Sequence, residues 1–285
     1  VTPKNESTMS VYRVLTMFVI LLSSGIVRSQ ELFVYSEPAS NMPARSTGLR
    51  LTNWMMDEVN TDRINYHFIP EVMWGVSRDL MVHAEGFISN RGTSLTWEGA
   101  ALYGKYRFLS RDNVYRHFRM AAFARVATNN ADIHQETIQV NGHNSGYQAG
   151  VVATQLLHKT ALSFTGFYEQ AYNNRKGNDY PTSQPNSAYN YILSAGKLML
   201  PKKYTSYNQT NMNLMAEVIG QWLPATGQHS VDIAPSVQFI VHSQMRFDIG
   251  YRQELYSNMW RTAPNGLLVR FEYLLFNSVP RLNGK

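Results

Sequence analysis

The chain has 285 residues, with 26 Lys and Arg against 20 Asp and Glu, and it contains no cysteine. Charged residues make up 16% of the sequence, below the about 25% that is usual in soluble proteins. The lack of cysteine excludes a disulfide-stapled secreted scaffold. The positive charge is mild and not clustered, so nucleic-acid binding is not indicated.

An apolar stretch over 14–27 is the first feature along the chain. It is short for a membrane-spanning helix and has the length of a signal-peptide core, with Arg13 as its positive flank. We expect a signal peptide over residues 1–29, with Met9 as the natural start and residues 1–8 either misannotated or non-native. A retained signal anchor is the alternative. Residues 30–45 contain Pro38 and Pro43, which disfavour a strand, so we expect a periplasmic arm or a plug there.

From residue 46 to residue 277, polar and apolar residues alternate in one segment after another. In the segment 246–255, Phe247, Ile249 and Tyr251 share one face, and Asp248 lies on the other with further charges. Successive side chains of a strand point to opposite faces, and a tilted strand of about ten residues spans a bilayer. Apolar-out, polar-in alternation is typical of a membrane β-barrel.

The pattern predicts twelve strands, with ten or fourteen as the alternatives. The predicted strands are 46–54, 66–76, 80–89, 97–109, 117–128, 146–157, 161–172, 188–200, 211–223, 230–241, 245–256 and 267–277. The fold class is therefore all-β: a transmembrane, antiparallel, up-and-down β-barrel over 46–277. A periplasmic tail over 278–285 completes the predicted domain organisation.

The connections predict the orientation of the barrel, because bacterial barrels have short periplasmic turns and longer external loops. The connections after the second, sixth and tenth strands are short. Those after the fourth and eighth, around 110–116 and 201–210, are expected to be longer. The two longest connections, 129–145 and 173–187, follow odd-numbered strands. A periplasmic N-terminus satisfies most of this pattern.

Tryptophans gather at the interface between a membrane and water. We expect all five to lie there, four at the external ends of the strands and one near the opposite rim. These interface residues are Trp54, Trp97, Trp222 and Trp260, with Trp74 at the opposite rim.

A family resemblance can be given on these features. The signal, Gln30 at the mature N-terminus, the 37–43 segment (EPASNMP) and a Tyr- and Asn-rich barrel resemble outer-membrane β-barrel proteins of Bacteroidetes. The resemblance is architectural and covers the mature chain. It implies the outer membrane of a Gram-negative bacterium and, for many members, a transporter-like role. It lends no functional residues, and the chain departs from the usual ending because nine residues follow Phe276.

Charged residues on the polar faces are the candidate lumen-lining and selectivity residues. They are Glu71, Glu85, Arg119, Arg125, Glu169, Glu217, Arg246, Asp248, Arg252, Glu254, Arg270 and Glu272. Those of the last two strands form either a charge ladder that sets selectivity or a structural filling of a narrow barrel.

A tight turn after residue 76 would place Glu71 opposite Glu85 and Met73 opposite His83. Opposed carboxylates destabilise a sheet unless a proton or cation lies between them. One interpretation is a cation or metal site made by these four residues. The favoured interpretation is a lumen network without metal, in which an arginine neutralises the pair. The candidate arginines are Arg119, Arg125 and Arg252.

Catalytic patterns are weak in this sequence. His143 and Ser145 lie close together in a Gly- and Asn-rich segment, which raises an outer-membrane lipid hydrolase as a remote alternative. The histidine spacings match no zinc enzyme, and no cofactor is expected. The leading hypothesis is a narrow pore or transporter for a small solute or ion. The competing hypothesis is a non-conducting structural or accessory subunit. Expected partners are outer-membrane lipid, a small solute or ion, and other outer-membrane or periplasmic proteins.

Overall fold

The computed structural model describes residues 33–59, 63–92, 94–114, 116–201 and 209–279. Within these residues, no helix is long and apolar enough to cross a bilayer. The predicted signal peptide and most of the predicted C-terminal tail lie outside the described residues. The strands are β1 (Thr47–Asp57), β2 (Ile64–Gly75), β3 (Leu80–Ser89), β4 (Thr96–Asp112), β5 (Arg116–Asn129), β6 (Ser145–Leu157), β7 (Thr160–Tyr172), β8 (Ser187–Leu200), β9 (Asn211–Leu223), β10 (Gln228–Val241), β11 (Met245–Ser257) and β12 (Gly266–Leu275).

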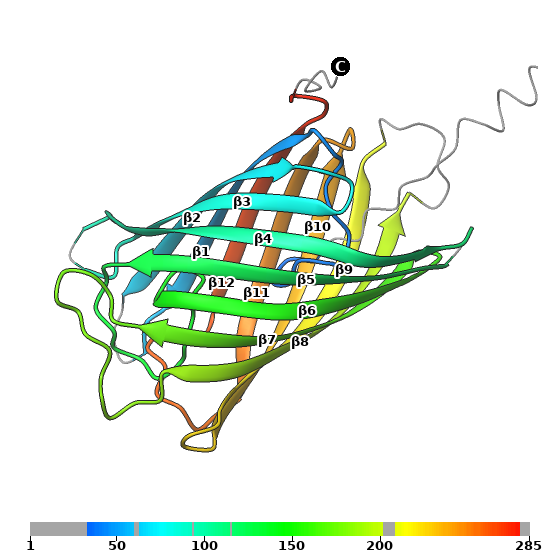
Figure 1. The fold of residues 1–285 in the computed structure, drawn as a ribbon. Helices are drawn as coiled ribbons and strands as arrows, with labels where there is room; N and C mark the ends of the chain where they lie inside the picture. The colour runs from blue at the N-terminus through cyan, green and yellow to red at the C-terminus, as the bar shows by residue number, and fades with distance from the viewer. Residues whose placement is uncertain (1–32, 60–62, 93, 115, 202–208, 280–285) are drawn as a thin grey trace, which may run out of the picture. The chain divides into compact units, whose positions relative to one another are not determined.

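Across the described residues these twelve strands form one closed barrel (Figure 1). Each strand pairs antiparallel with its neighbours in the sequence, and β1 closes the ring against β12. The predicted all-β, up-and-down barrel of twelve strands is confirmed. Closure leaves no unpaired strand edge, which is what a sheet in lipid requires.

Alternation along each strand divides the wall into two faces. On β8, Tyr189, Tyr191 and Leu193 are exposed on the outside, whereas Asn190 and Ser194 are buried on the inside. The outer wall is therefore apolar and the inner wall largely polar. This is the inverse of a water-soluble protein and matches a barrel whose outer solvent is lipid.

The register predicted for β2 and β3 is confirmed. Glu71 pairs with Glu85, and Met73 pairs with His83. The tight connection after Gly75 fixes this pairing, because side chains alternate strictly and a shift by one residue would reverse both faces.

One predicted connection is wrong. We expected a long turn over 110–116, but β4 runs to Asp112 and β5 starts at Arg116. The reason is a polar cluster that continues the hairpin: the carboxylate of Asp112 accepts hydrogen bonds from His117 at 2.9 Å and from Arg119 at 3.0 Å. This hairpin projects beyond its neighbours at the right of Figure 1.

The barrel has two unlike ends, which we call the short-turn end and the loop end. The short-turn end carries the connections after the even-numbered strands and the chain leading into β1. The loop end carries the long connections 130–144 and 173–186. Four tryptophans have exposed side chains: Trp74 (37%), Trp97 (57%), Trp222 (47%) and Trp260 (54%).

Trp54 corrects the prediction that all five tryptophans lie at the membrane interface. It faces the inside of the barrel, where its ring meets that of Tyr35 edge-on at 5.1 Å. The reason is parity: Leu49 and Leu51 point outward from β1, so the even-numbered positions point inward.

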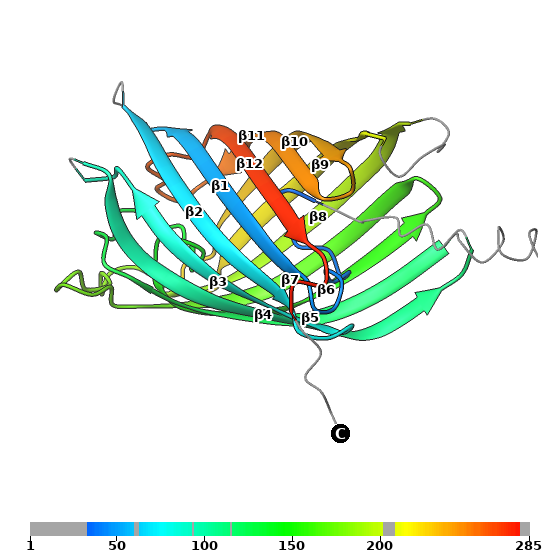
Figure 2. The ribbon, with the colours of Figure 1, turned by 90° about the horizontal axis from the view of Figure 1, so that it is seen from above.

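Residues 33–45, which we call the arm, lie inside the ring of strands (Figure 2, dark blue trace). Phe33, Val34 and Ala39 of the arm are almost fully buried. Phe33 and Val34 pack with Met215 and Leu156, and Ala39 packs with Met81 and Phe123. The apolar part of the core therefore lies between the arm and the inner wall.

Candidate functional site

The arm is held inside the barrel by wall side chains, and Glu217 on β9 is the central one. Its Oε2 accepts hydrogen bonds from the backbone N–H groups of Val34 (3.0 Å) and Tyr35 (2.8 Å). Its Oε1 accepts from the N–H and the hydroxyl of Ser36, both at 3.0 Å, and from the hydroxyl of Ser194 at 2.9 Å. A carboxylate with several such donors is a strong acceptor, so one buried side chain fixes three consecutive arm residues.

A second group of wall side chains holds the middle of the arm. Lys105 is fully buried, and its Nζ donates to the carbonyl oxygens of Pro38 (2.5 Å) and Ser40 (2.9 Å). Thr154 Oγ1 accepts from the N–H of Ala39 at 3.0 Å. Backbone groups of the arm thus find partners in wall side chains, as buried polar groups must.

Glu37 ties the arm into a network of charges. Its carboxylate lies 2.6 Å from Arg50 Nη1 and 3.7 Å from Lys105 Nζ. Burial by itself raises the pKa of Glu37, but the charges of Arg50 and Lys105 outweigh burial and hold that pKa well below its usual range. Arg50 also contacts Glu272 at 2.8 Å and Glu71 at 3.3 Å, so the arm carboxylate joins two wall carboxylates around one guanidinium.

The predicted carboxylate pair lies at the edge of this network. Glu71, His83 and Glu85 offer ligand atoms within 4.8 Å of one another. Each carboxylate already has a guanidinium partner: Arg50 for Glu71, and Arg125 for Glu85 at 3.0 Å and 3.1 Å. The two guanidinium groups already neutralise the carboxylates, as a metal ion would. The residues therefore fit a charge-neutralised lumen network better than a metal site. The fourth residue of the speculative metal set, Met73, packs against Gly48.

A second cluster of charges fills the wall of β10, β11 and β12. Arg246 contacts Asp248 at 2.9 Å and Glu272 at 3.4 Å, and Arg270 lies 3.9 Å from Asp248. Nearer the loop end, Asp232 binds Arg252 at 2.5 Å and Arg261 at 2.6 Å. Arg261 also binds Glu254 at 2.9 Å. The ladder of charges expected on the last two strands is therefore internally paired.

Residues 130–144, which we call the inner loop, fold into the barrel from the loop end. Ile138 and Val140 of this loop are fully buried. Gln221 both accepts from the N–H of Ile138 (2.9 Å) and donates to its carbonyl oxygen (2.7 Å). The N–H of Val140 donates to Glu169 Oε1 at 3.1 Å. An inward loop whose backbone is bonded to the wall narrows the lumen.

Two histidines lie where the inner loop meets β2. The rings of His67 and His143 meet edge-on at 5.2 Å. Arg91, which is ion-paired with Glu98, contacts His143 Nδ1 and donates to the carbonyl oxygen of Gly142 at 3.1 Å. Burial, with the nearby positive charge of Arg91 and with His67, lowers the pKa of His143 well below its usual range. His143 is therefore neutral near pH 7.

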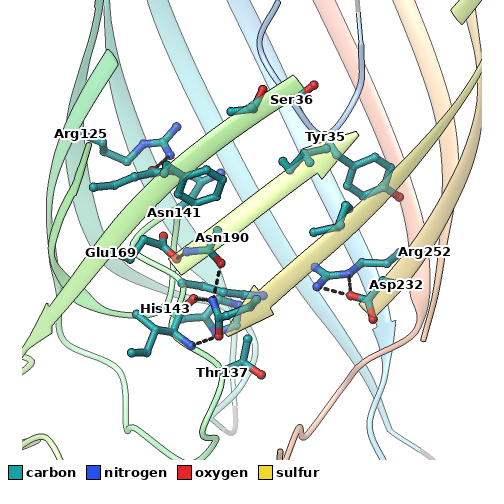
Figure 3. Close-up of a pocket in the computed structure, with 18 of the residues that line it drawn as sticks. Tyr35, Ser36, Arg125, Thr137, Asn141, His143, Glu169, Asn190, Asp232 and Arg252 are labelled. Carbon is teal, nitrogen blue, oxygen red and sulfur yellow. Dashed lines mark hydrogen bonds and ion pairs between the residues drawn. The ribbon is translucent and has the colours of Figure 1, made fainter. Parts of the chain in front are cut away.

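A cavity of about 190 Å³ lies between the arm and the inner loop. In Figure 3, Tyr35 and Ser36 of the arm lie at one end, and Thr137 and His143 of the inner loop lie at the other. Arg125 and Glu169 line one side, and the Arg252–Asp232 pair lines the opposite side. We call this space the lumen cavity.

The candidate lumen residues fall on the inner face. Buried in the wall are Glu71, Glu85, Glu169, Glu217, Arg246, Asp248, Arg252, Arg270 and Glu272. Arg119 reaches the hydroxyl of Ser40 in the arm at 2.7 Å, and Arg125 and Glu254 are partly buried. Sequence reasoning missed Arg50, Lys105 and Asp232 as parts of these clusters. Alternation could have placed both basic residues on the inner face. Arg50 lies between two leucines that point outward, and Lys105 shares the inner face of β4 with Tyr103.

His143 and Ser145 do not form a catalytic pair. The hydroxyl of Ser145 donates to the carbonyl oxygen of Asn129 (3.1 Å) and accepts from its N–H (2.8 Å). His143 instead contacts Arg91. These bonds fit the structural interpretation of this segment as a loop turn.

Solved structures with similar folds include an outer membrane channel from Pseudomonas putida F1, with a TM-score of 0.56 and 9% identity. The match covers 85% of this chain and 100% of that chain. Another is the outer membrane protein OprD from Pseudomonas aeruginosa, with a TM-score of 0.39, 8% identity and coverage of 85% and 97%. At such identities the likeness to the first shows a shared fold alone, and the second carries no argument. No protein-family model and no curated protein matches the chain.

Proposed function

We propose that this chain is an outer-membrane barrel of the Bacteroidetes type that passes a small solute or ion through a narrow lumen. The arm acts as its gate at the short-turn end. The observation that carries the proposal is the way the arm is held: its anchors are side chains grouped around Glu217 and Lys105, whereas the barrel strands are held by continuous backbone ladders. A segment held by side chains can leave without opening the barrel.

The membrane location is tested first. A closed barrel with an apolar outer face resists detergent until it is heated, so we expect heat-modifiable migration on a gel. We also expect fractionation with the outer membrane. Recovery of the folded chain as a soluble periplasmic protein would contradict the proposal.

The gate is tested by locking the arm to the wall. The hydroxyls of Ser36 in the arm and Ser194 on β8 lie 2.9 Å apart, and the chain has no cysteine to interfere. Because the two side chains are in contact, we expect the double variant S36C/S194C to form a disulfide between positions 36 and 194. In planar bilayers we expect no current from the oxidised protein and at least the wild-type current after reduction.

The single variants S36C and S194C serve as matched controls, because each loses one of the two hydroxyls without forming the cross-link within the chain. Neither should respond to reduction. Equal current from the oxidised and reduced double variant would contradict the gate. No current from any form, at any potential, would contradict the pore.

A second function is favoured by the burial of the arm, in which Phe33, Val34 and Ala39 are almost fully buried against the inner wall. A non-conducting accessory subunit would keep the arm in place and bind other outer-membrane or periplasmic proteins. In that case no form of S36C/S194C conducts, and the native mass in mild detergent exceeds that of one chain.

A further inference from the structure

Four residues that line the lumen cavity carry buried polar atoms without a hydrogen-bond partner among the described protein atoms. They are His67 Nε2, Thr137 Oγ1, Thr165 Oγ1 and Tyr35 Oη. His67, Thr137 and Thr165 are at most 6% exposed. Leaving a buried polar group unpaired costs about 1–3 kcal/mol, so four of them around one cavity indicate a space for a hydrogen-bonding occupant.

These atoms are spread over opposite ends of the cavity. Tyr35 belongs to the arm, and Thr165 on β7 lies two residues from Ser163, which bonds to Thr154 beneath the arm. Thr137 belongs to the inner loop, and His67 meets that loop at Gly142. An occupant that bonds both ends must therefore carry polar groups on opposite sides.

The charged groups of the cavity already have partners, and those of Glu169 are neutral: the N–H of Val140 at 3.1 Å and the amide of Asn190 at 3.0 Å. Arg125 is bound to Glu85 and donates to Gln148 Oε1 at 2.6 Å. Arg252 is bound to Asp232. A charged occupant would compete with these pairs or meet a like charge beside them, whereas an uncharged one leaves them intact.

Aromatic side chains form much of the remaining lining. The rings of Tyr103 and Phe123 lie 5.8 Å apart, and those of Phe123 and Phe167 lie 6.0 Å apart. Trp54 packs against Tyr35 on another side. Flat apolar faces combined with a few placed polar groups are typical of sites for small ring compounds.

We infer that the lumen cavity binds a small, uncharged ring compound that carries hydroxyl groups on opposite sides. This inference rests on the proposed function, for which it names the class of solute. Thr165 and Tyr35 bond the hydroxyls at the arm end, and Thr137 and His67 bond those at the inner-loop end. A sugar and a phenol share this chemistry.

Trp54 provides a reporter inside the site. The other four tryptophans are exposed and do not line the cavity, so an occupant of the cavity changes the emission of Trp54 alone. The full chain in detergent is titrated with glucose, and W54F is titrated in parallel. We expect a saturable change in the wild type and none in W54F. Resorcinol, which absorbs in the same range, is titrated by calorimetry. The two titrations distinguish a sugar from a phenol as the ligand.

Charge is tested with glucosamine and glucuronate, the cationic and anionic relatives of glucose. We expect both to bind at least tenfold more weakly than glucose. The hydroxyls are tested with T165V and T137V, each of which should weaken binding about tenfold, the effect of one lost hydrogen bond. T226V is the matched control, because Thr226 lies in the exposed turn after β9, where its hydroxyl donates to Gln228 Oε1 at 2.6 Å.

Each variant is first shown to be folded by its heat-modifiable migration. Saturable binding of glucose or resorcinol that T165V and T137V weaken, and T226V does not, supports the inference. No binding of either compound, or equal binding of the charged relatives, overturns it. If the wild type conducts but binds neither, the inference fails and the pore stands. If it binds but no form conducts, the pore fails and the binding site stands.

Discussion

At the short-turn end the arm is held chiefly by charged side chains of the wall, whereas at the loop end the inner loop is held by neutral amides, one carboxylate, Arg91 and apolar burial. Glu217 and Lys105 bond five backbone groups of the arm between them. Gln221 and Glu169 bond three backbone groups of the inner loop. The arm is therefore anchored mainly at two charged wall residues, whereas the bonds to the inner loop are spread over several side chains, Arg91, Asn129 and Asn174 among them.

The largest effect should come from Glu217. E217Q removes a charged acceptor from four arm donors, and we expect arm docking to weaken by about 3 kcal/mol, or roughly a hundredfold. E169Q, at the loop end, removes one bond to the inner loop and should weaken its docking by about 1.5 kcal/mol.

Cysteine labelling measures both openings, because the chain has no cysteine of its own. Ala39 in the arm and Val140 in the inner loop are fully buried. E217Q should speed maleimide labelling of A39C and leave V140C unchanged, and E169Q should do the reverse. If both variants speed both labels equally, the two ends open as one unit and the comparison is broken.

An intermediate effect is expected at Gly142. Its φ is 113°, and a Cβ there would overlap the imidazole ring of His67. G142A should therefore displace the inner loop at a cost of about 2–3 kcal/mol and speed labelling of V140C. G177A is the matched control, since Gly177 also has a positive φ (80°) but has no atom within 4 Å of the added Cβ. Equal labelling in both variants would assign the effect to backbone strain alone.

The smallest effect is a pH dependence of the loop end. The pKa of His143 is held well below 6.5 by burial, Arg91 and His67, with smaller contributions from His134 and Arg252. When the inner loop is released, His143 regains its ordinary pKa of 6.5 and binds a proton that it does not bind in the packed loop. Packing is therefore weakened as pH falls below 6.5, by up to about 1.4 kcal/mol per pH unit. We expect V140C labelling, normalised to unfolded protein, to rise between pH 7.5 and pH 5.5 and to rise less in H143N.

The arm end should behave differently in the same titration. The lowered pKa of Glu37 means that its stabilisation is fully present above the ordinary carboxyl value of 4.5 and is lost as pH falls through lower values. A39C labelling should therefore stay constant between pH 7.5 and pH 5.5. A parallel rise of both labels would show that the ends share one titrating group.

The barrel was predictable because alternation is a local property. The pairing of Glu71 with Glu85 followed from one tight turn, and the strand faces followed from the period of two. The inward position of Trp54 was also predictable from the sequence. Trp54 and Arg50 are even-numbered positions of β1, and Leu49 and Leu51 lie on the opposite face. Its place near a strand end suggested the interface instead.

The lumen contacts were not predictable in the same way. Glu217 lies more than 180 residues from the arm backbone that it binds, and Gln221 lies 83 residues from Ile138. Such pairs depend on where an irregular segment lies after the barrel has closed. No periodicity encodes that position. The arm's prolines indicated only that it was not a strand.

The arm remains joined to β1 at all times, and its base is bonded in place: the N–H of Arg45 donates to the carbonyl oxygen of Gly75 at 2.6 Å. Release is therefore a unimolecular event, and the freed segment stays at an effective concentration in the millimolar range, as for any short tether. Rebinding needs no encounter from solution. Single channels should accordingly open in brief bursts that end spontaneously, and diluting the protein should leave the burst length unchanged.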